Sequence, residues 1–315
     1  MVTQTPTRAL RTSQHGSALD LAILKTLIYA DIFGFPMRDT EIQHFLIGYS
    51  ATLHDVQTAL KESSDLAVAV ECQLPYFALR DRTFPINQRD SRDQASEQLL
   101  KVSRFYGTLL AHLPFVRMVA LTGALAMRNA GSEADDIDFM LVTSEGRVWT
   151  ARAAAILLVR LARLFKVKLC PNYVLAQSAL YQNRQDLFIA HELAQMIPLS
   201  GLSVYEAMRA ENAWALTLLP NAAHPLYTER DCSSRGIGRI LQRVTEFLLS
   251  GPPGDVFERW EKNRKIRKFA ADSRKAHSAA QIDGQQVKGH FNDYGYPTLE
   301  RYAARLKSYD LEIEE

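Results

Sequence analysis

The sequence predicts an α/β protein of the α+β type, in which a small mixed sheet is flanked by helices. Apolar runs with strand character, at 115–123 and 137–143, alternate with segments of helical periodicity. Hydrophobic residues make up 47% of the chain and charged residues 23%, which is the balance of a globular protein. With 315 residues, the chain is long enough for about two domains.

The N-terminal segment is expected to be a disordered lead-in up to residue 16. Residues 1–16 are polar and lack the apolar stretch of a secretory signal. From residue 18 onward, apolar side chains recur at helical spacing, and Ser17 can accept a hydrogen bond from the first turn. A helix is therefore predicted from Ser17 to the glycine and proline break at 34–36.

Residues 17–80 are predicted to form a winged-helix-like domain. Asp39 and Thr52 are expected to cap two further short helices. Two strand-like runs, at 66–72 and 75–80, follow as a hairpin. Three helices followed by a hairpin is the order of elements in a winged helix.

DNA binding by this domain is not expected. The segment 52–63, in the position of a recognition helix, carries one basic residue, Lys61, beside Asp55 and Glu62. Contacts to the phosphate backbone supply much of the affinity for DNA, so this helix is poorly equipped for it. A packing or dimerisation module is favoured, which leaves a homodimer open.

A core domain is predicted at residues 95–180, after a charged stretch at 80–94 that is interpreted as a boundary or an exposed loop. Helices and strands alternate in this core with short connections. The expected elements are a helix at 94–113, a strand at 115–123, a short helix and turn at 124–136, a strand at 137–143, a helix at 148–165 and a third strand at 167–175.

Residues 181–315 are predicted to form a helical C-terminal region. The basic run at 262–268 has two interpretations, a binding site for a triphosphate or an acidic acceptor, and a solvated helix face. The solvated face is favoured. The expected helices lie at 187–197, 203–216, 238–250, 256–273 and 297–309.

Charge and cysteine content indicate a cytoplasmic protein. The formal net charge of +2 gives no overall field that would make nucleic acid an obligatory partner. The three cysteines are far apart and form no CxxC pair, as in proteins of a reducing compartment. The most apolar segment, 148–165, contains three arginines, so it is predicted to be an amphipathic helix, and no membrane partner is expected.

Two aspartates mark the start of the strand at 137–143. Asp136 and Asp138 are two positions apart and therefore project from the same face of a strand. Neighbouring carboxylates repel each other, and a divalent cation is the usual remedy. Gly123 ends the preceding strand and allows a tight turn into a helix, whose free N–H groups favour phosphate. The alternative interpretation is a solvated turn in which Asp135 acts as a cap.

The strand, the TGALAM turn, the short helix and the segment GSEADDIDFMLVT together resemble the nucleotidyltransferase superfamily, the DNA polymerase β-like group. By this resemblance, Gly123 is the signature glycine, and Asp136 and Asp138 are the catalytic acids that bind Mg²⁺ or Mn²⁺. The resemblance implies a nucleoside triphosphate as substrate and transfer of its nucleotidyl group to an acceptor, which is a small molecule, a protein or an RNA. The residues expected around the nucleotide phosphates are Thr122, Gly123, Ala124, Arg128 and Ser132.

Two departures from that pattern leave two functional hypotheses. Ala124 stands where many members of the superfamily have serine, and Asn172 stands on the strand where a third carboxylate is expected. The first hypothesis is a magnesium-dependent nucleotidyltransferase. The second is a catalytically inactive nucleotide-binding or interaction module. An acid from the C-terminal region that reaches the site, Glu192 or Asp186, would favour the enzyme.

Overall fold

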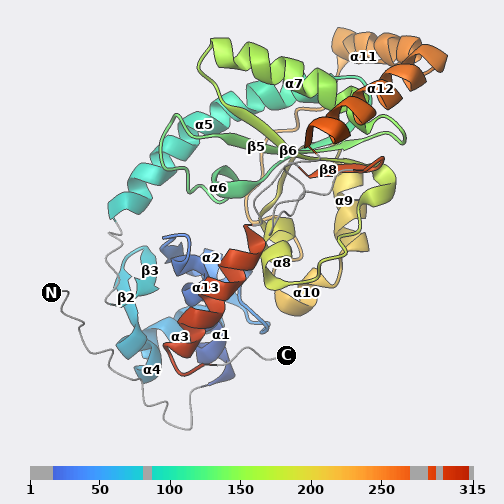
Figure 1. Ribbon diagram of the computed structural model, residues 1–315. Helices are drawn as coiled ribbons and strands as arrows, with labels where there is room; N and C mark the ends of the chain where they lie inside the picture. The colour runs from blue at the N-terminus through green and yellow to red at the C-terminus, as the bar shows by residue number, and fades with distance from the viewer. Residues whose placement is uncertain (1–16, 81–86, 270–282, 289–293, 312–315) are drawn as a thin grey trace, which may run out of the picture.

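The structure is a computed structural model in which residues 17–80, 87–269, 283–288 and 294–311 are described. It has two sheets flanked by helices, and this confirms the predicted α+β class. The first sheet belongs to the N-terminal domain. The second is formed by strands from residue 116 to residue 288 (Figure 1). The predicted lead-in, residues 1–16, lies outside the described residues.

The N-terminal domain has the order of elements of a winged helix, with one additional helix. Its first strand pairs with the second strand of the hairpin, which gives the antiparallel order β1-β3-β2. Ser17 caps α1, where it accepts a hydrogen bond from the backbone N–H of Asp20 at 3.1 Å. The elements are α1 (Ala18–Asp31), β1 (Met37–Arg38), α2 (Asp39–His44), α3 (Leu53–Glu62), α4 (Ser64–Ala69), β2 (Val70–Gln73) and β3 (Tyr76–Leu79).

Two local predictions in this domain need correction, whereas the cap at Thr52 is confirmed. The segment 66–69, expected to begin a strand, is part of α4, because Ser63 caps that helix and Leu66 and Ala69 are buried on one helical face. Asp39 is the first residue of α2 and not its cap. The cap position is Arg38, whose backbone N–H donates to Glu41 at 2.7 Å.

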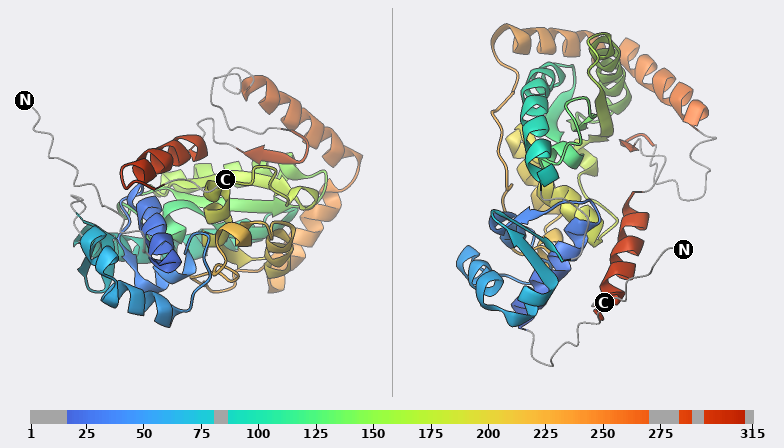
Figure 2. Two further views of the ribbon diagram at one scale, coloured as in Figure 1. Left: turned by 90° about the horizontal axis from the view of Figure 1, so that it is seen from below. Right: turned by 90° about the vertical axis from the view of Figure 1, so that its left-hand side faces the viewer.

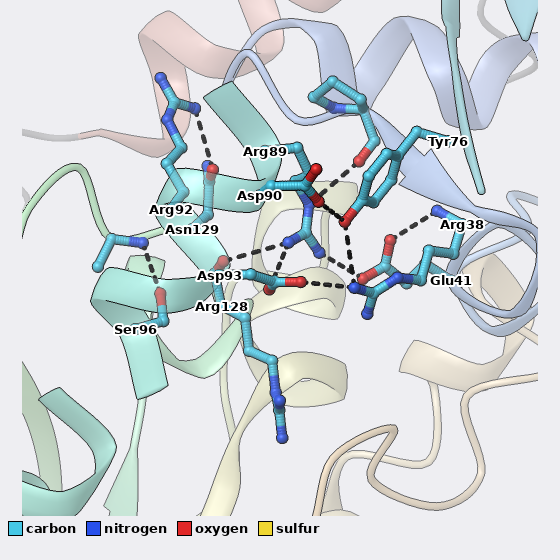
Figure 3. A network of polar contacts seen from close by, with 12 residues as sticks. Arg38, Glu41, Tyr76, Arg89, Asp90, Arg92, Asp93, Ser96, Arg128 and Asn129 are labelled. Atoms are coloured by element: carbon cyan, nitrogen blue, oxygen red, sulfur yellow. Dashed lines mark hydrogen bonds and ion pairs between the residues drawn. The ribbon is translucent and has the colours of Figure 1, made fainter. Parts of the chain in front are cut away.

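The charged stretch at 80–94 is not a loop throughout, since α5 (Asn87–Ala111) begins inside it. Arg89, in the first turns of α5, is completely buried and bridges Glu41 of α2 at 2.7 Å and Asp93 at 2.6 Å (Figure 3). Asp93 also pairs with Arg38 at 2.5 Å. The charges that suggested a solvated boundary therefore join the N-terminal domain to the core.

The core is a five-stranded mixed sheet with the order β7-β4-β5-β6-β8. β5 runs antiparallel to β4 and parallel to β6, and the long helix α7 forms the crossover between β5 and β6. These elements follow the predicted ones closely. Their bounds are β4 (Val116–Leu121), α6 (Gly123–Ala126), β5 (Ile137–Thr143), α7 (Val148–Leu164) and β6 (Leu169–Ala176), followed by the short 3₁₀ helix η1 (Gln177–Ala179).

The C-terminal region is mostly helical, as predicted, but it also supplies two strands to the core sheet. β7 pairs with β4, and β8 pairs with β6, so residues beyond 180 form both edges of that sheet. Both strands are short, which is why no periodic signal predicted them. The elements are α8 (Leu187–Gln195), β7 (Ile197–Ser200), α9 (Leu202–Glu211), α10 (Ala215–Leu218), α11 (Gly236–Leu249), α12 (Pro252–Phe269), β8 (Gln286–Lys288) and α13 (Gly295–Lys307).

The two faces of the core sheet pack into different hydrophobic clusters. On β5, Phe139 and Leu141 face a cluster formed with α5 and α7, whereas Met140 and Val142 face a cluster that includes α8, α13 and the N-terminal domain. α13 lies along α1, away from α11 and α12 (Figures 1 and 2). Within the described residues, no helix is long and apolar enough to cross a membrane.

Candidate functional site

The two aspartates lie at the N-terminal end of β5, and Asp138 is on the sheet face that is covered by α8. Asp138 has the orientation of Met140 and Val142 because side chains alternate along a strand, and it is partly buried. Asp136 precedes the strand and is exposed. A predicted pair of carboxylates is therefore present, with one member at the surface and the other inside.

Gly123 lies directly against the inner carboxylate. Its φ angle of +67° is in the left-handed region, which favours glycine, and a Cβ atom at this position would lie 2.5 Å from Oδ2 of Asp138. The backbone N–H of Thr122 also donates to the backbone carbonyl of Asp138 at 3.1 Å. The glycine turn and the aspartate thus form one compact unit.

Asn172 also reaches this unit. The pairing of β5 with β6 shifts between Phe139 and Met140, so Asn172 is the extra residue of a bulge in β6. Its amide nitrogen donates a hydrogen bond to Oδ1 of Asp138. The position where a third carboxylate was expected therefore holds an amide, and this amide is hydrogen-bonded to the carboxylate of Asp138.

The electrostatic environment of the aspartates favours a cation. Burial and the negative charge of Asp136 raise the pKa of Asp138 to about 6, although the hydrogen bond from Asn172 acts in the opposite direction. Burial, together with the two aspartates, also raises the pKa of Cys170 to about 12. Lys168 lies 3.5 Å from Asp136, but its side chain is largely exposed, so it screens the inner carboxylate little.

Glu192 brings a further carboxyl group to the same face of the sheet. It lies on α8, which packs against α6, the helix that begins at Gly123. Burial raises the pKa of Glu192 to about 7; Lys288 lowers this pKa, and the charge of Asp138 raises it. Asp186 is engaged elsewhere, since it caps α8 and pairs with Arg184. Of the two acids considered from the sequence, Glu192 is the one whose charge interacts with Asp138.

The other predicted phosphate ligands are not gathered around Asp138. Ser132 is exposed and donates to Asp135 at 3.1 Å, so this pair closes a local turn, as the alternative interpretation of Asp135 suggested. The guanidinium of Arg128 stacks 4.6 Å from the ring of Tyr227, next to the N-terminal domain. Ala124 lies in α6, a helix of only four residues. A phosphate here would depend on individual backbone N–H groups more than on a helix dipole.

The acids fit magnesium better than a metal that requires a complete protein cage. Among the described residues, no group of three His, Cys, Asp or Glu side chains is arranged to hold a metal ion. Mg²⁺ commonly keeps several water molecules and is bound by one or two carboxylates together with substrate phosphates. Asp136 and Asp138, with the amide of Asn172 beside them, correspond to such a set.

The sequence predicted the two aspartates but not the residues that surround them. Lys168 and Cys170 come close to Asp136 only because β5 and β6 run parallel in a particular register. Lys288 comes from β8, a strand that was not predicted. No local pattern in the sequence signals these three positions.

Comparison with models of known protein families, with curated proteins and with solved structures gives no match to this chain.

Proposed function

We propose that this protein is a magnesium-dependent nucleotidyltransferase that transfers a nucleoside monophosphate from a nucleoside triphosphate to an acceptor. The observation that carries the proposal is the contact between the glycine turn and the inner carboxylate. Gly123 adopts a left-handed conformation against Asp138, and the negative charge of Asp136 acts on Asp138. A phosphate next to a backbone turn and a pair of carboxylates is the arrangement that phosphoryl-transfer chemistry requires.

Each group has a distinct role in this proposal. Asp136 and Asp138 hold the ion, and the backbone N–H groups at Gly123 and Ala124 orient the phosphates. The ion, when bound, supplies charge neutralisation at the phosphates. Glu192, with a pKa near 7, is the candidate for accepting the proton of the acceptor hydroxyl, because a general base works best when its pKa is near the operating pH.

A second candidate function is nucleotide binding without transfer. Asn172 donates a hydrogen bond to Asp138 where the superfamily pattern has a third acid, and Ala124 has no hydroxyl for a phosphate contact. Both differences weaken catalysis more than binding, since backbone contacts to phosphate remain. In this case the winged-helix-like domain mediates interaction or regulation.

The binding site is tested first by calorimetric titration of magnesium and each nucleoside triphosphate. We expect binding that requires magnesium in the wild type and is lost in Asp136→Asn/Asp138→Asn. Glu133→Gln is the matched control, because Glu133 is an exposed acid in the same segment. Absence of binding to the wild type, or equal loss in the control, would refute the site.

The two candidate functions are separated by a transfer assay with labelled nucleotide. For the enzyme, we expect Glu192→Gln to retain triphosphate binding and to lose label transfer to any acceptor, including water. If the wild type binds the triphosphate but releases no pyrophosphate with any acceptor supplied, the second candidate function is supported. Circular dichroism of each variant checks that its fold is retained.

A further inference from the structure

The helices α11 and α12 pack with their polar sides inward. The amide of Gln242, on α11, is buried and donates to the carbonyl oxygens of Ala111 at 3.1 Å and Leu113 at 2.8 Å. Glu246 accepts from the backbone N–H of Phe115 at 2.6 Å and pairs with Arg117 at 2.7 Å. The polar face of α11 is therefore built into the end of α5 and the start of β4, and the orientation of the helix is fixed.

Because the polar face of α11 is turned toward the protein, its outward face is apolar. Ile237 is 84% exposed and Phe247 is 81% exposed, although side chains of this kind are usually buried. The exposed apolar residues recur at intervals of three and four, so they form a single stripe along the helix. They are Ile237, Ile240, Leu241, Val244, Phe247 and Leu248, and we call this set the α11 stripe.

α12 repeats this inverted arrangement. Glu258 is buried and accepts hydrogen bonds from the backbone N–H groups of Trp149 at 2.8 Å and Thr150 at 2.7 Å, which stabilises the N-terminus of α7. Phe257 and Trp260 are exposed. Both helices lie at the end of the molecule farthest from the N-terminal domain (Figures 1 and 2).

The charges of α11 and α12 are predominantly positive. Residues 236–269, which form both helices, contain eight basic and four acidic residues, whereas the whole chain has a net charge of only +2. Each of the four acids is engaged within the protein: Glu246 with Arg117, Asp255 with Arg147, Glu258 with the start of α7, and Glu261 with Arg264. Arg239 and Arg243 flank the stripe and are exposed.

We propose that the α11 stripe docks on the surface of an anionic lipid bilayer. Exposed Ile, Leu and Phe side chains on one helical face, flanked by arginines, are the features of helices that lie in a membrane interface. A second copy of this chain fits the charge less well, because two stripes that pack antiparallel would bring together Arg239 and Arg243 of both copies. This proposal departs from the expectation of no membrane partner, which rested on the absence of a segment that could span a bilayer; docking at the surface needs no spanning helix.

The test is sedimentation of the full chain with vesicles of phosphatidylcholine alone and with vesicles that also contain phosphatidylglycerol. We expect binding to the anionic vesicles that weakens as salt is raised, because basic side chains contribute through a screened field. Ile240→Asp should weaken this binding about tenfold or more, since it places a charge in the stripe. Val68→Asp is the matched control, because Val68 is 56% exposed on α4, at the other end of the molecule.

Two further measurements make the result decisive. Arg239→Glu/Arg243→Glu should weaken binding to anionic vesicles while leaving the thermal unfolding of the protein unchanged. Light scattering after size exclusion reports whether the stripe joins two copies instead. A dimer that Ile240→Asp converts to monomer, equal binding to both kinds of vesicle, or no vesicle binding at all would each overturn the proposal. None of these outcomes depends on nucleotide binding.

Discussion

Gly123 and Asp138 determine the local geometry of the candidate site. The turn at Gly123 needs a left-handed backbone, and the absence of a Cβ atom leaves room for the carboxylate of Asp138. That carboxylate is partly buried, next to a second acid, and bound to the amide of Asn172. Its environment disfavours the charged form until a cation is bound, which couples metal binding to protonation.

Replacement of Gly123 by alanine is expected to affect both stability and binding. The left-handed backbone alone costs about 1–2 kcal/mol with a Cβ atom present. Gly146→Ala is a control for this backbone cost, because Gly146 has a similar φ of +64° and a Cβ atom there would meet nothing within 4 Å. We therefore expect both variants to lose stability in urea unfolding, but only Gly123→Ala to lose magnesium-dependent nucleotide binding. Equal nucleotide binding by both variants would contradict the role of this turn.

Asp138→Asn is expected to change how stability depends on pH. The pKa of Asp138 is raised from 3.8 to about 6, so the folded state holds a proton that the unfolded state has lost between these values. The wild type must then lose stability as pH rises from about 4 to about 6, by roughly 1–3 kcal/mol from this group. The asparagine variant lacks this loss. Denaturant unfolding at pH 4 and pH 7.5 without metal measures the difference, and parallel pH profiles for the two proteins would argue against it.

The start of α5 is rich in charged residues, yet several of them are paired inside the protein and are not exposed to solvent. Arg89 is completely buried, with Glu41 and Asp93 as partners, and its guanidinium lies 4.3 Å from the ring of Phe35. Arg92 donates to Asn129 at 3.0 Å (Figure 3). It also donates to the carbonyl oxygen of Gly34 at 2.8 Å. Side chains of α5 therefore bind both the N-terminal domain and the turn that follows α6.

Arg89→Met is expected to be strongly destabilising, by about 3–5 kcal/mol, because it leaves Glu41 buried without its cationic partner. Arg89→Met/Glu41→Gln should lose less than the single variant, since the uncompensated charge is removed as well. The control is Arg235→Ala, which breaks an exposed pair with Asp231 and should cost less than about 1 kcal/mol. Urea denaturation measures all three. A loss in Arg89→Met no larger than in Arg235→Ala would show that the network contributes little.

At the scale of the whole molecule, the N-terminal domain and the core share one hydrophobic cluster. The ring of His191, on α8, stacks 4.0 Å from Tyr29 and 5.8 Å from Phe45, both of the N-terminal domain. Tyr302 of α13 contacts Tyr29 from another side, and Arg305 pairs with Asp31. Residues of α8 and of the C-terminal helix α13 thus complete the core of the first domain.

We therefore expect the isolated fragment 17–80 to be poorly folded. Without α8 and α13, Tyr29 and Phe45 lose their partners, and Glu41 loses Arg89. Domains of this size are marginally stable even with a complete core. An amide correlation spectrum of the fragment should show narrow dispersion, whereas the full chain should show wide dispersion. A well-dispersed spectrum from the fragment would mean that the domain is independent of the core.

The sequence by itself determined the elements whose pattern is local. The strand at Ile137–Thr143, the helix from Ser17 and the turn at Gly123 depend on periodicity, a cap and a glycine, which neighbouring residues specify. Only the tertiary structure decided which distant segments complete the sheet and the site. β7, β8 and Glu192 lie far along the chain, and their positions depend on long-range pairing and burial. The same reason explains the inward polar faces of α5 and α11, because a charged or amide side chain can be buried only where the folded chain supplies its partner.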